Sequence, residues 1–215
     1  MQNDKQTKKK LIECAKKEFI EKGFMKASLR NICKNAGATT GAMYFFFKDK
    51  EELFESVVGS QLIELQNVVK EHFSLEDEYV EGSKDAINLT PDDLQDDYQT
   101  AVDVLSLLFK YKDEYLLLIE NAKGTKYEKI VDIFVQMFYE HYLSLYCAAK
   151  GYKSKKQLTD EDTFIVHWMS HDQIDIIIHL LTHCEKVEEA QKQLKNMFNY
   201  MVGGWLAVIK KEIIR

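Results

Sequence analysis

Residues that break helices are scarce along this chain, and that scarcity is the strongest constraint on its fold. The 215 residues include one proline and nine glycines. Proline cannot continue a helix interior and glycine weakens one, so their scarcity favours long uninterrupted helices. Alternating apolar and polar runs bounded by turn residues, which indicate strands, are also scarce. The sequence therefore predicts an all-α protein of about nine helices.

Two helical domains are expected from the length and from the helix signals. We predict a small amino-terminal domain over residues 1–54, a larger domain over residues 55–215, and a connecting helix from about 50 to 73. Thr90-Pro91 and Thr159-Asp160 are typical helix starts, with a capping threonine followed by proline or acidic residues. The further helices are expected over about 90–111, 112–122, 125–149, 159–183 and 186–214.

Residues 28–36 have the pattern of a short helix that ends at a glycine. Ser28 can cap its start by accepting from a free backbone N–H group. Ile32 and Ala36 lie four residues apart and form one apolar edge. Gly37 can adopt the left-handed conformation that ends a helix at little steric cost.

A second short helix follows the glycine turn. Thr39 or Thr40 can cap it, and Met43 and Phe47 again lie four residues apart, facing back toward the first helix. Two helices joined by such a turn are typical of a helix-turn-helix, whose second helix enters the major groove of DNA. The alternative from spacing alone is an ordinary helical hairpin with a glycine cap.

Charge is distributed unevenly along the chain. Residues 1–50 carry twelve Lys and Arg against five Asp and Glu, a net charge of +7, and the total of −6 leaves −13 for residues 51–215. Only the amino end has the positive net charge that favours binding of a polyanion such as DNA. Its basic segment coincides with the predicted helix-turn-helix. The lysines that could contact phosphate are Lys8, Lys9, Lys10, Lys16, Lys17, Lys34, Lys48 and Lys50.

The amino end resembles the TetR-type transcriptional regulators. The resemblance rests on three consecutive segments: TKKKLIECAKKEFIEKGF (residues 7–24), SLRNICKNAG (28–37) and ATTGAMYFFFKDKEEL (38–53). Within them, the residues that match the family pattern are Ser28, Ile32, Ala36, Gly37, Gly41, Tyr44, Phe47, Lys50 and Leu53. The rest of the chain matches only in length and helical character, as is usual in a family with divergent ligand-binding domains.

The resemblance implies roles for individual residues. Arg30 would reach a base edge, the start of the second helix would lie against the groove, and Tyr44 and Lys50 would contact phosphates. The DNA-binding candidates are thus Arg30, Thr39, Thr40, Gly41, Ala42, Tyr44 and Lys50. Phe46 replaces the usual histidine and cannot donate a hydrogen bond, and Cys33 replaces the usual alanine. Arg30 could alternatively be a solvated helix charge.

The final predicted helix has a wide apolar surface. Apolar residues recur at three- and four-residue intervals, and Gly203-Gly204 in mid-helix suggests close backbone approach. The family resemblance implies a homodimer formed by the last two helices, whereas a monomeric core helix with a tolerated kink is the alternative. The interface candidates are Leu194, Phe198, Met201, Trp205 and Val208.

The middle helices are rich in aromatic residues spaced to line a bundle interior. The family resemblance implies that a cavity for a small-molecule effector lies among them. The effector-pocket candidates are Phe109, Phe134, Phe138, Tyr142, Trp168, His171 and Asp175.

His167, His171, Asp175, His179 and His183 form a row at successive four-residue intervals, which we call the histidine row. Histidines at this spacing can bind zinc, especially beside a carboxylate. Three interpretations remain open: polar lining of an effector pocket, a metal site, or histidines that are solvated or satisfied at an interface.

These patterns, together with the family resemblance, predict a ligand-responsive DNA-binding regulator, a repressor that binds a palindromic operator as a homodimer. The alternative is a helical-bundle metalloprotein or metal sensor that uses the histidine row. No catalytic motif or cofactor motif is visible, so we expect neither an enzyme nor a bound cofactor. Four cysteines without paired spacing, no signal peptide and no run long enough to cross a bilayer predict a cytoplasmic protein.

Overall fold

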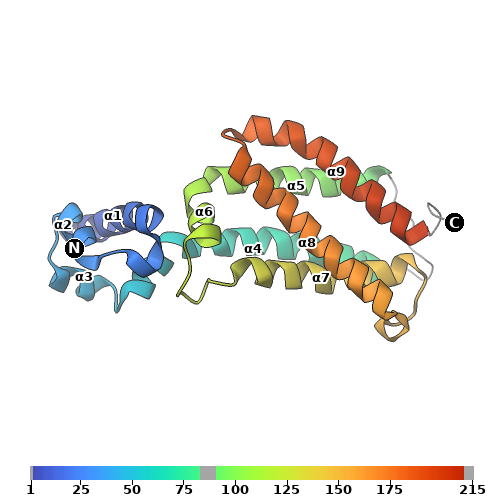
Figure 1. Ribbon diagram of the computed structural model, residues 1–215, viewed down its shortest axis with the longest axis horizontal. Helices are drawn as coiled ribbons and strands as arrows, with labels where there is room; N and C mark the ends of the chain where they lie inside the picture. Colours follow the sequence, from blue (N-terminus) through green and yellow to red (C-terminus); the bar gives the residue numbers. More distant parts are fainter. Residues whose placement is uncertain (1, 83–90, 211–215) are drawn as a thin grey trace. The chain divides into compact units, whose positions relative to one another are not determined.

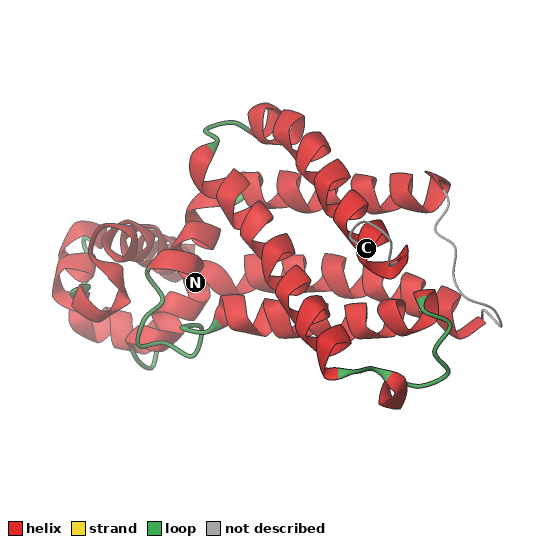
Figure 2. Ribbon diagram, turned by 45° about the vertical axis from the view of Figure 1, so that its right-hand side comes forward, coloured by secondary structure: helices red, strands yellow, loops and turns green. Residues whose placement is uncertain are grey.

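The computed structural model describes the backbone of residues 2–82 and 91–210. This described part is helical, with no strand (Figure 2). The all-α prediction is therefore confirmed. The helices are α1 (Gln2–Lys26), α2 (Leu29–Ala36), α3 (Thr40–Phe46), α4 (Lys50–Gly82), α5 (Pro91–Lys110), α6 (Lys112–Glu120), α7 (Ile130–Ala149), α8 (Asp160–His183) and α9 (Val187–Lys210), with a 3₁₀ turn at Lys155–Gln157.

The chain forms two compact units whose limits differ from the expected boundary at residue 54. The first unit comprises residues 1–65 and 111–130, and the second comprises residues 66–110 and 131–215. Helix α4 begins in the first unit and ends in the second. The physical reason for the difference is that α6 and the loop after it pack against α1 and α4, a long-range contact with no local sequence signal.

The core of the first unit joins α1 to α4 through aromatic rings. Phe19 and Phe54 are fully buried, and their ring centroids lie 5.1 Å apart in an edge-to-face arrangement. Phe24 meets Phe54 at 5.4 Å, and Tyr127 approaches the same ring at 6.2 Å. Edge-to-face pairs bring the positive ring edge to the negative face, so this cluster fixes ring orientation as well as burying apolar area.

Residues 111–130 are held to the first unit by polar contacts as well. The Phe24 amide donates to the Asn121 carbonyl at 3.0 Å, and the Tyr115 hydroxyl donates to the Gln61 carbonyl at 2.8 Å. The Lys126 ammonium lies 2.7 Å from a Glu55 carboxylate oxygen. This segment is therefore an integral part of the unit that carries α2 and α3.

Most predicted helix limits are close to those observed. Thr159 caps α8 as expected, and a reciprocal hydrogen bond with Asp162 completes a capping box. The prediction that a helix starts near residue 125 was wrong, because turns with Gly124 at φ 86° precede α7. The expected cap at Thr90 and the expected end of the last helix at Ile214 lie outside the described residues.

The second unit is a bundle in which α8 runs obliquely across α7 and the later part of α4 (Figure 1). One of its cores joins α5, α8 and α9 through Leu105, Leu180 and Leu194. Another joins α7 and α8 through Leu143, Tyr146 and Val166. Inward-facing leucines and aromatics thus hold α5, α7, α8 and α9 together.

Candidate nucleic-acid interface

Helix α2 begins and ends as its sequence predicts. Ser28 Oγ accepts a hydrogen bond from the Asn31 amide at 3.3 Å, which caps the amino end. Gly37 closes the carboxyl end in the left-handed conformation at φ 65°, and the following Ala38 amide donates to the Cys33 carbonyl at 2.9 Å. Ile32 is fully buried, so one edge of α2 faces the core as expected.

Helix α3 is capped by Thr39 and not by Thr40. Thr39 Oγ1 accepts from the Ala42 amide at 3.0 Å, and Met43 and Phe47 are buried at the other side of the helix. Thr40 is left exposed at the first helical position. The two short helices around Gly37 therefore have the arrangement predicted for a helix-turn-helix.

The face of α2 and α3 that points away from the core is open to solvent. Arg30, Thr40 and Gly41 are exposed, and Ala42 is half-buried. Tyr44 is 56% exposed. These side chains are free to meet a ligand as large as a DNA duplex.

Phe45 is a surface residue that the sequence reasoning passed over. Its side chain is 78% exposed, and its ring lies 5.0 Å from that of Phe46. Large apolar side chains are seldom left so open in a short helix without a partner. The helical position of Phe45, opposite buried Met43, was the available signal.

Lys50 has an internal contact that the sequence did not predict. Its ammonium donates to the carbonyls of Ala27 at 2.9 Å and Met25 at 3.3 Å, and it lies 4.7 Å from the centre of the Phe24 ring. Burial lowers the pKa of the Lys50 ammonium. Lys50 thus holds the turn between α1 and α2, and its contact with phosphate stays a prediction.

Lys16 is also engaged within the first unit. Its ammonium lies 3.0 Å from carboxylate oxygens of both Asp113 and Glu114 at the start of α6. Burial opposes its charge, but the two acidic hydrogen-bond partners outweigh that effect and raise the pKa of Lys16. The other six lysines named as possible phosphate contacts are exposed: Lys8, Lys9, Lys10, Lys17, Lys34 and Lys48.

Glu18 is a buried acidic residue that positions α2. One carboxylate oxygen accepts from the Ser28 amide at 3.1 Å and from the Asn31 side chain at 3.5 Å. A carboxylate at the amino end of a helix also interacts favourably with the helix dipole. Glu18 therefore helps to fix the orientation of α2 relative to α1.

Cys33 is buried between α2 and its neighbours. Burial raises the pKa of its thiol, which keeps the thiol protonated and poorly reactive. Packing in place of alanine accounts for its presence.

The sequence of this helix-turn-helix matches a known family. Residues 11–57 match the model of the "Bacterial regulatory proteins, tetR family". Residues 11–57 therefore form a domain similar to the TetR-type regulatory domain. The family is one of regulatory proteins and not of enzymes.

Curated relatives match over the same part of the chain. The HTH-type transcriptional repressor BepR of Brucella suis is 37% identical over 54 residues, which is 25% of this chain and 26% of that protein. The HTH-type transcriptional regulator AcrR of Shigella flexneri is 38% identical over 56 residues, 26% of each chain. The match thus spans about a quarter of the length of these TetR-type relatives.

A solved structure has a similar fold over most of the chain. The crystal structure of NalD, the secondary repressor of the MexAB-OprM multidrug efflux pump in Pseudomonas aeruginosa, aligns with a TM-score of 0.56 at 20% sequence identity. The alignment covers 92% of this chain and 96% of NalD. This likeness concerns the fold.

The second unit contains a cavity of about 180 Å³. Aromatic and aliphatic side chains from α4, α5, α7, α8 and α9 form most of its wall, and His72, Glu76 and Asp97 form a polar side. No lysine or arginine lines it among the described residues. Its wall includes Phe73, Phe138, Tyr142, Phe198, Met201 and Trp205.

Only two of the seven effector-pocket candidates proposed from the sequence line the cavity. Phe138 and Tyr142 line it. Five candidates lie elsewhere in the described structure, because helical spacing identifies a face without identifying what covers it. Those five are Phe109, Phe134, Trp168, His171 and Asp175, of which Trp168 and Asp175 are exposed.

The apolar stripe assigned to a dimer interface faces the interior of its own unit. Leu194 is 1% exposed and packs in the core, and Phe198 is buried against the Tyr98 ring. Trp205 meets the Tyr142 ring edge-on at 5.1 Å, and Val208 packs beside Tyr146. Leu194 and Phe198 therefore belong to the protomer core and not to an interface between copies. Met201, Trp205 and Val208 are partly buried, and their place in an interface stays a prediction.

The histidine row lies on the solvent side of α8. His167, His179 and His183 are exposed, and the rings contact one another only as neighbours, with His179 stacked on His183 at 4.0 Å. The row is not among the groups in the described residues that could hold a metal ion.

No helix within the described ranges is both long enough and apolar enough to cross a membrane.

Proposed function

We propose that this chain is a transcriptional regulator that binds a palindromic DNA operator as a homodimer and is released by a small-molecule effector. The observation that carries the proposal is the helix-turn-helix of α2 and α3, with its outer face exposed and its inner face fixed in the core. The names of the relatives BepR and AcrR, an HTH-type repressor and regulator, support it.

In this proposal, the start of α3 lies against the major groove. Arg30 pairs with a base edge, and Thr39, Thr40, Gly41 and Ala42 approach the groove wall. Tyr44 donates to a phosphate, and exposed Phe45 contacts sugar or a thymine methyl group. Exposed lysines such as Lys34 and Lys48 add contacts to phosphate without reading sequence.

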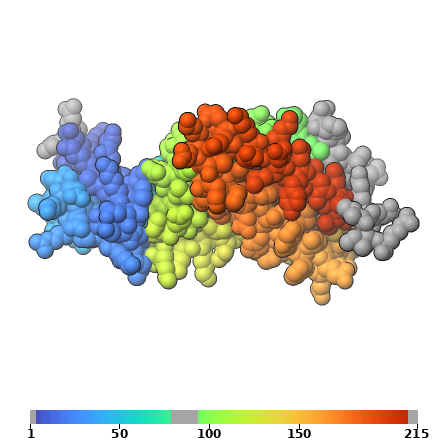
Figure 3. Space-filling model, turned by 45° about the horizontal axis from the view of Figure 1, so that its top comes forward, coloured from blue at the N-terminus to red at the C-terminus, as the bar shows by residue number. Residues whose placement is uncertain are grey.

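We further propose that the dimer forms through the outward faces of α8 and α9. Phe164 and Trp168 lie one turn apart on α8 and are exposed, as is Tyr200 on α9. Gly203 and Gly204 are exposed one turn further on, with open space where a side chain would lie. Figure 3 shows α9 at the surface of the second unit, with α8 beside it. Aromatic side chains beside two glycines would let a second copy approach closely.

The cavity of the second unit is the proposed effector site. Its wall is mainly apolar and aromatic, which suits a small molecule with a large apolar surface. An effector that binds one conformation of the dimer more tightly shifts the population toward it. A differential affinity of about 1–3 kcal/mol is a typical coupling between two sites.

Selection of bound duplexes from a random pool, with the full-length chain, tests the DNA-binding role. We expect a palindrome whose half-sites lie about 34–36 Å apart or a multiple of that distance. Arg30→Ala should weaken binding to the selected duplex by about 1–3 kcal/mol, roughly five- to 150-fold. The matched control is Lys153→Ala, which removes one exposed positive charge outside the first unit.

A salt titration measures how many phosphates the protein contacts. The logarithm of the association constant should fall linearly with the logarithm of salt concentration, with a slope of about −0.9 for each phosphate contacted. Failure to recover any preferred duplex, or an Arg30→Ala effect no larger than that of Lys153→Ala, would overturn the proposal.

A further inference from the structure

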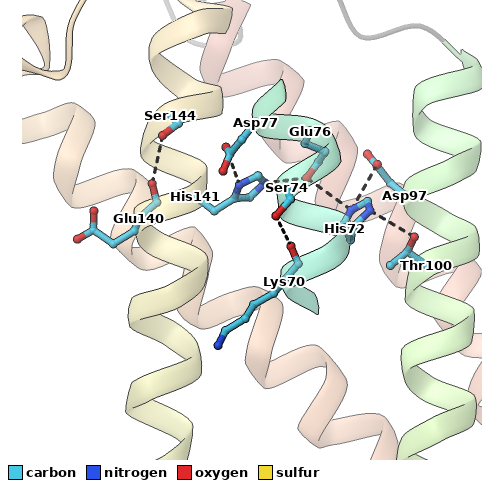
Figure 4. A network of polar contacts seen from close by, with 10 residues as sticks. All are labelled: Lys70, His72, Ser74, Glu76, Asp77, Asp97, Thr100, Glu140, His141 and Ser144. Atoms are coloured by element: carbon cyan, nitrogen blue, oxygen red, sulfur yellow. Dashed lines mark hydrogen bonds and ion pairs between the residues drawn. The ribbon is translucent and has the colours of Figure 1, made fainter. Parts of the chain in front are cut away.

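A compact cluster of histidine and carboxylate groups lies on the polar side of the cavity (Figure 4). His72 and Glu76 are one turn apart on α4, and Asp97 comes from α5. His72 Nε2 lies 3.5 Å from Glu76 Oε2 and 3.7 Å from Asp97 Oδ1. The three side chains are between 21% and 28% exposed, so they are partly shielded from solvent but reachable from the cavity.

The ring of His72 is oriented by a residue outside this trio. Thr100 Oγ1 lies 3.4 Å from His72 Nδ1. If Nδ1 carries the proton and donates it to this hydroxyl, the Nε2 lone pair faces the two carboxylates. In that tautomer, the His72 Nε2 lone pair and the two carboxylate oxygens face the same point. A lone pair facing two anions is unfavourable unless a proton or another cation lies between them.

Glu76 is itself fixed by a second histidine, from α7. His141 Nε2 lies 2.7 Å from Glu76 Oε2, and the His141 side chain is only 2% exposed. Its other nitrogen, Nδ1, lies 3.2 Å from Asp77 Oδ1 without hydrogen-bond geometry, and the ring stacks on Phe73 at 3.9 Å. A buried histidine that orients a ligating carboxylate is a typical feature around protein metal sites.

The spacing of the three donor atoms matches a coordination polyhedron. Donors bound to zinc at about 2.0–2.2 Å in tetrahedral geometry are separated by about 3.3–3.6 Å. The two separations from His72 Nε2 are close to that range, and all three donor atoms lie within 4.8 Å of one another. Small side-chain rotations would bring them to bonding distance, leaving a position open toward the cavity.

We propose that His72, Glu76 and Asp97 form a binding site for a divalent transition-metal ion, with Zn²⁺ as the expected occupant. One imidazole and two carboxylates favour zinc, nickel or cobalt over magnesium and calcium, which take oxygen ligands. His141 is a positioning residue, since it holds Glu76, and the bound ion would join α4 to α5. The site is distinct from the histidine row of α8 and does not depend on the proposed DNA-binding role.

Calorimetric titration of metal-free, full-length protein with Zn²⁺ tests the site. The wild-type chain should bind about one ion tightly, and the same ion should raise the melting temperature. His72→Ala should weaken that binding at least tenfold and remove the thermal shift. The matched control is His171→Ala, which deletes a histidine of the row on α8 and should leave both measurements unchanged.

A second variant, Asp97→Asn, keeps the test valid if His72→Ala misfolds. Asp97→Asn keeps the shape of the side chain while removing its charge, and it should also weaken Zn²⁺ binding at least tenfold. Absence of Zn²⁺ binding by the wild-type chain would overturn the proposal. So would equal binding by wild type, His72→Ala and Asp97→Asn, or loss of binding in His171→Ala alone, because these results place the ion elsewhere.

Discussion

At the scale of single residues, the lysines of the amino end differ in what their ammonium groups contact. Lys50 is held by two backbone carbonyls and an aromatic ring, whereas Lys48 is exposed two residues earlier. A buried hydrogen-bond donor stabilises the fold, and an exposed charge adds affinity for a polyanion. Lys50 should therefore affect mainly the stability of the fold, and Lys48 mainly the affinity for DNA.

Lys50→Met should destabilise the protein by about 1–3 kcal/mol, because it leaves the carbonyls of Met25 and Ala27 without their donor. Denaturant unfolding measures the loss. Lys48→Met is the matched control: it should change stability by less than about 0.5 kcal/mol but reduce the salt dependence of DNA binding by about one unit of slope. Equal stability of the two variants would contradict the role given to Lys50.

Asp162 carries a stability contribution that depends on pH. Burial alone raises its pKa, but hydrogen bonds from Thr159 and from the Tyr146 hydroxyl hold the pKa below its ordinary value of 3.8. A carboxyl group whose pKa is lowered by folding contributes stability above its unfolded pKa, and this contribution is lost as pH falls through the folded pKa.

Asp162→Asn should therefore cost about 1 kcal/mol, the usual loss for a broken helix cap. The difference from wild type should be constant between about pH 8 and about pH 5 and should shrink below 3.8. Urea unfolding across this pH range measures it. A difference that grows on acidification would show that the carboxylate is not stabilised by its partners.

At the scale of elements, the segment that follows α6 depends on a glycine. Gly124 has φ 86°, and a Cβ added there would overlap the side chain of Met25 in the first unit. The left-handed conformation is itself unfavourable for residues with a Cβ. The left-handed backbone therefore favours glycine at this position, whereas the exposed and flexible Met25 side chain can move aside.

Gly124→Ala should lower the free energy of unfolding by about 1–2 kcal/mol from backbone strain alone. Gly59→Ala in α4 is the matched control, since its Cβ would make an ordinary contact with Glu55 Cγ at 3.4 Å. That control should be neutral or stabilising by up to about 1 kcal/mol, because alanine favours the helix. Thermal unfolding compares the two, and a neutral Gly124→Ala would contradict the backbone strain expected at this position.

At the scale of the whole molecule, the proposed dimer places α8 and α9 at its centre. Tyr200→Glu puts a charge on the exposed face of α9 and should weaken self-association at least tenfold, about 1.4 kcal/mol. Sedimentation velocity over a range of concentrations measures the change. Ile133→Glu is the control, because Ile133 is similarly exposed on α7, away from this face. Unchanged association in Tyr200→Glu would exclude α9 from the interface.

The local part of this structure could be predicted from the sequence. Capping residues such as Ser28 and Thr159, and the turn at Gly37, act within a few residues of where they lie. Their hydrogen bonds and backbone conformations therefore leave a signal that can be read in order along the chain. The all-helical class and the helix-turn-helix follow from such signals.

Tertiary structure alone decided which face of each helix meets which partner. The stripe from Leu194 to Val208 was recognised as apolar, but its period could not tell an internal core from a contact between copies. Likewise, the histidine row is conspicuous along α8, whereas His72, Asp97 and His141 are distant in sequence and come together only through the packing of α4, α5 and α7. The sequence shows which residues are adjacent along the chain, whereas a cavity or an ion site is formed by residues that folding brings together from distant positions.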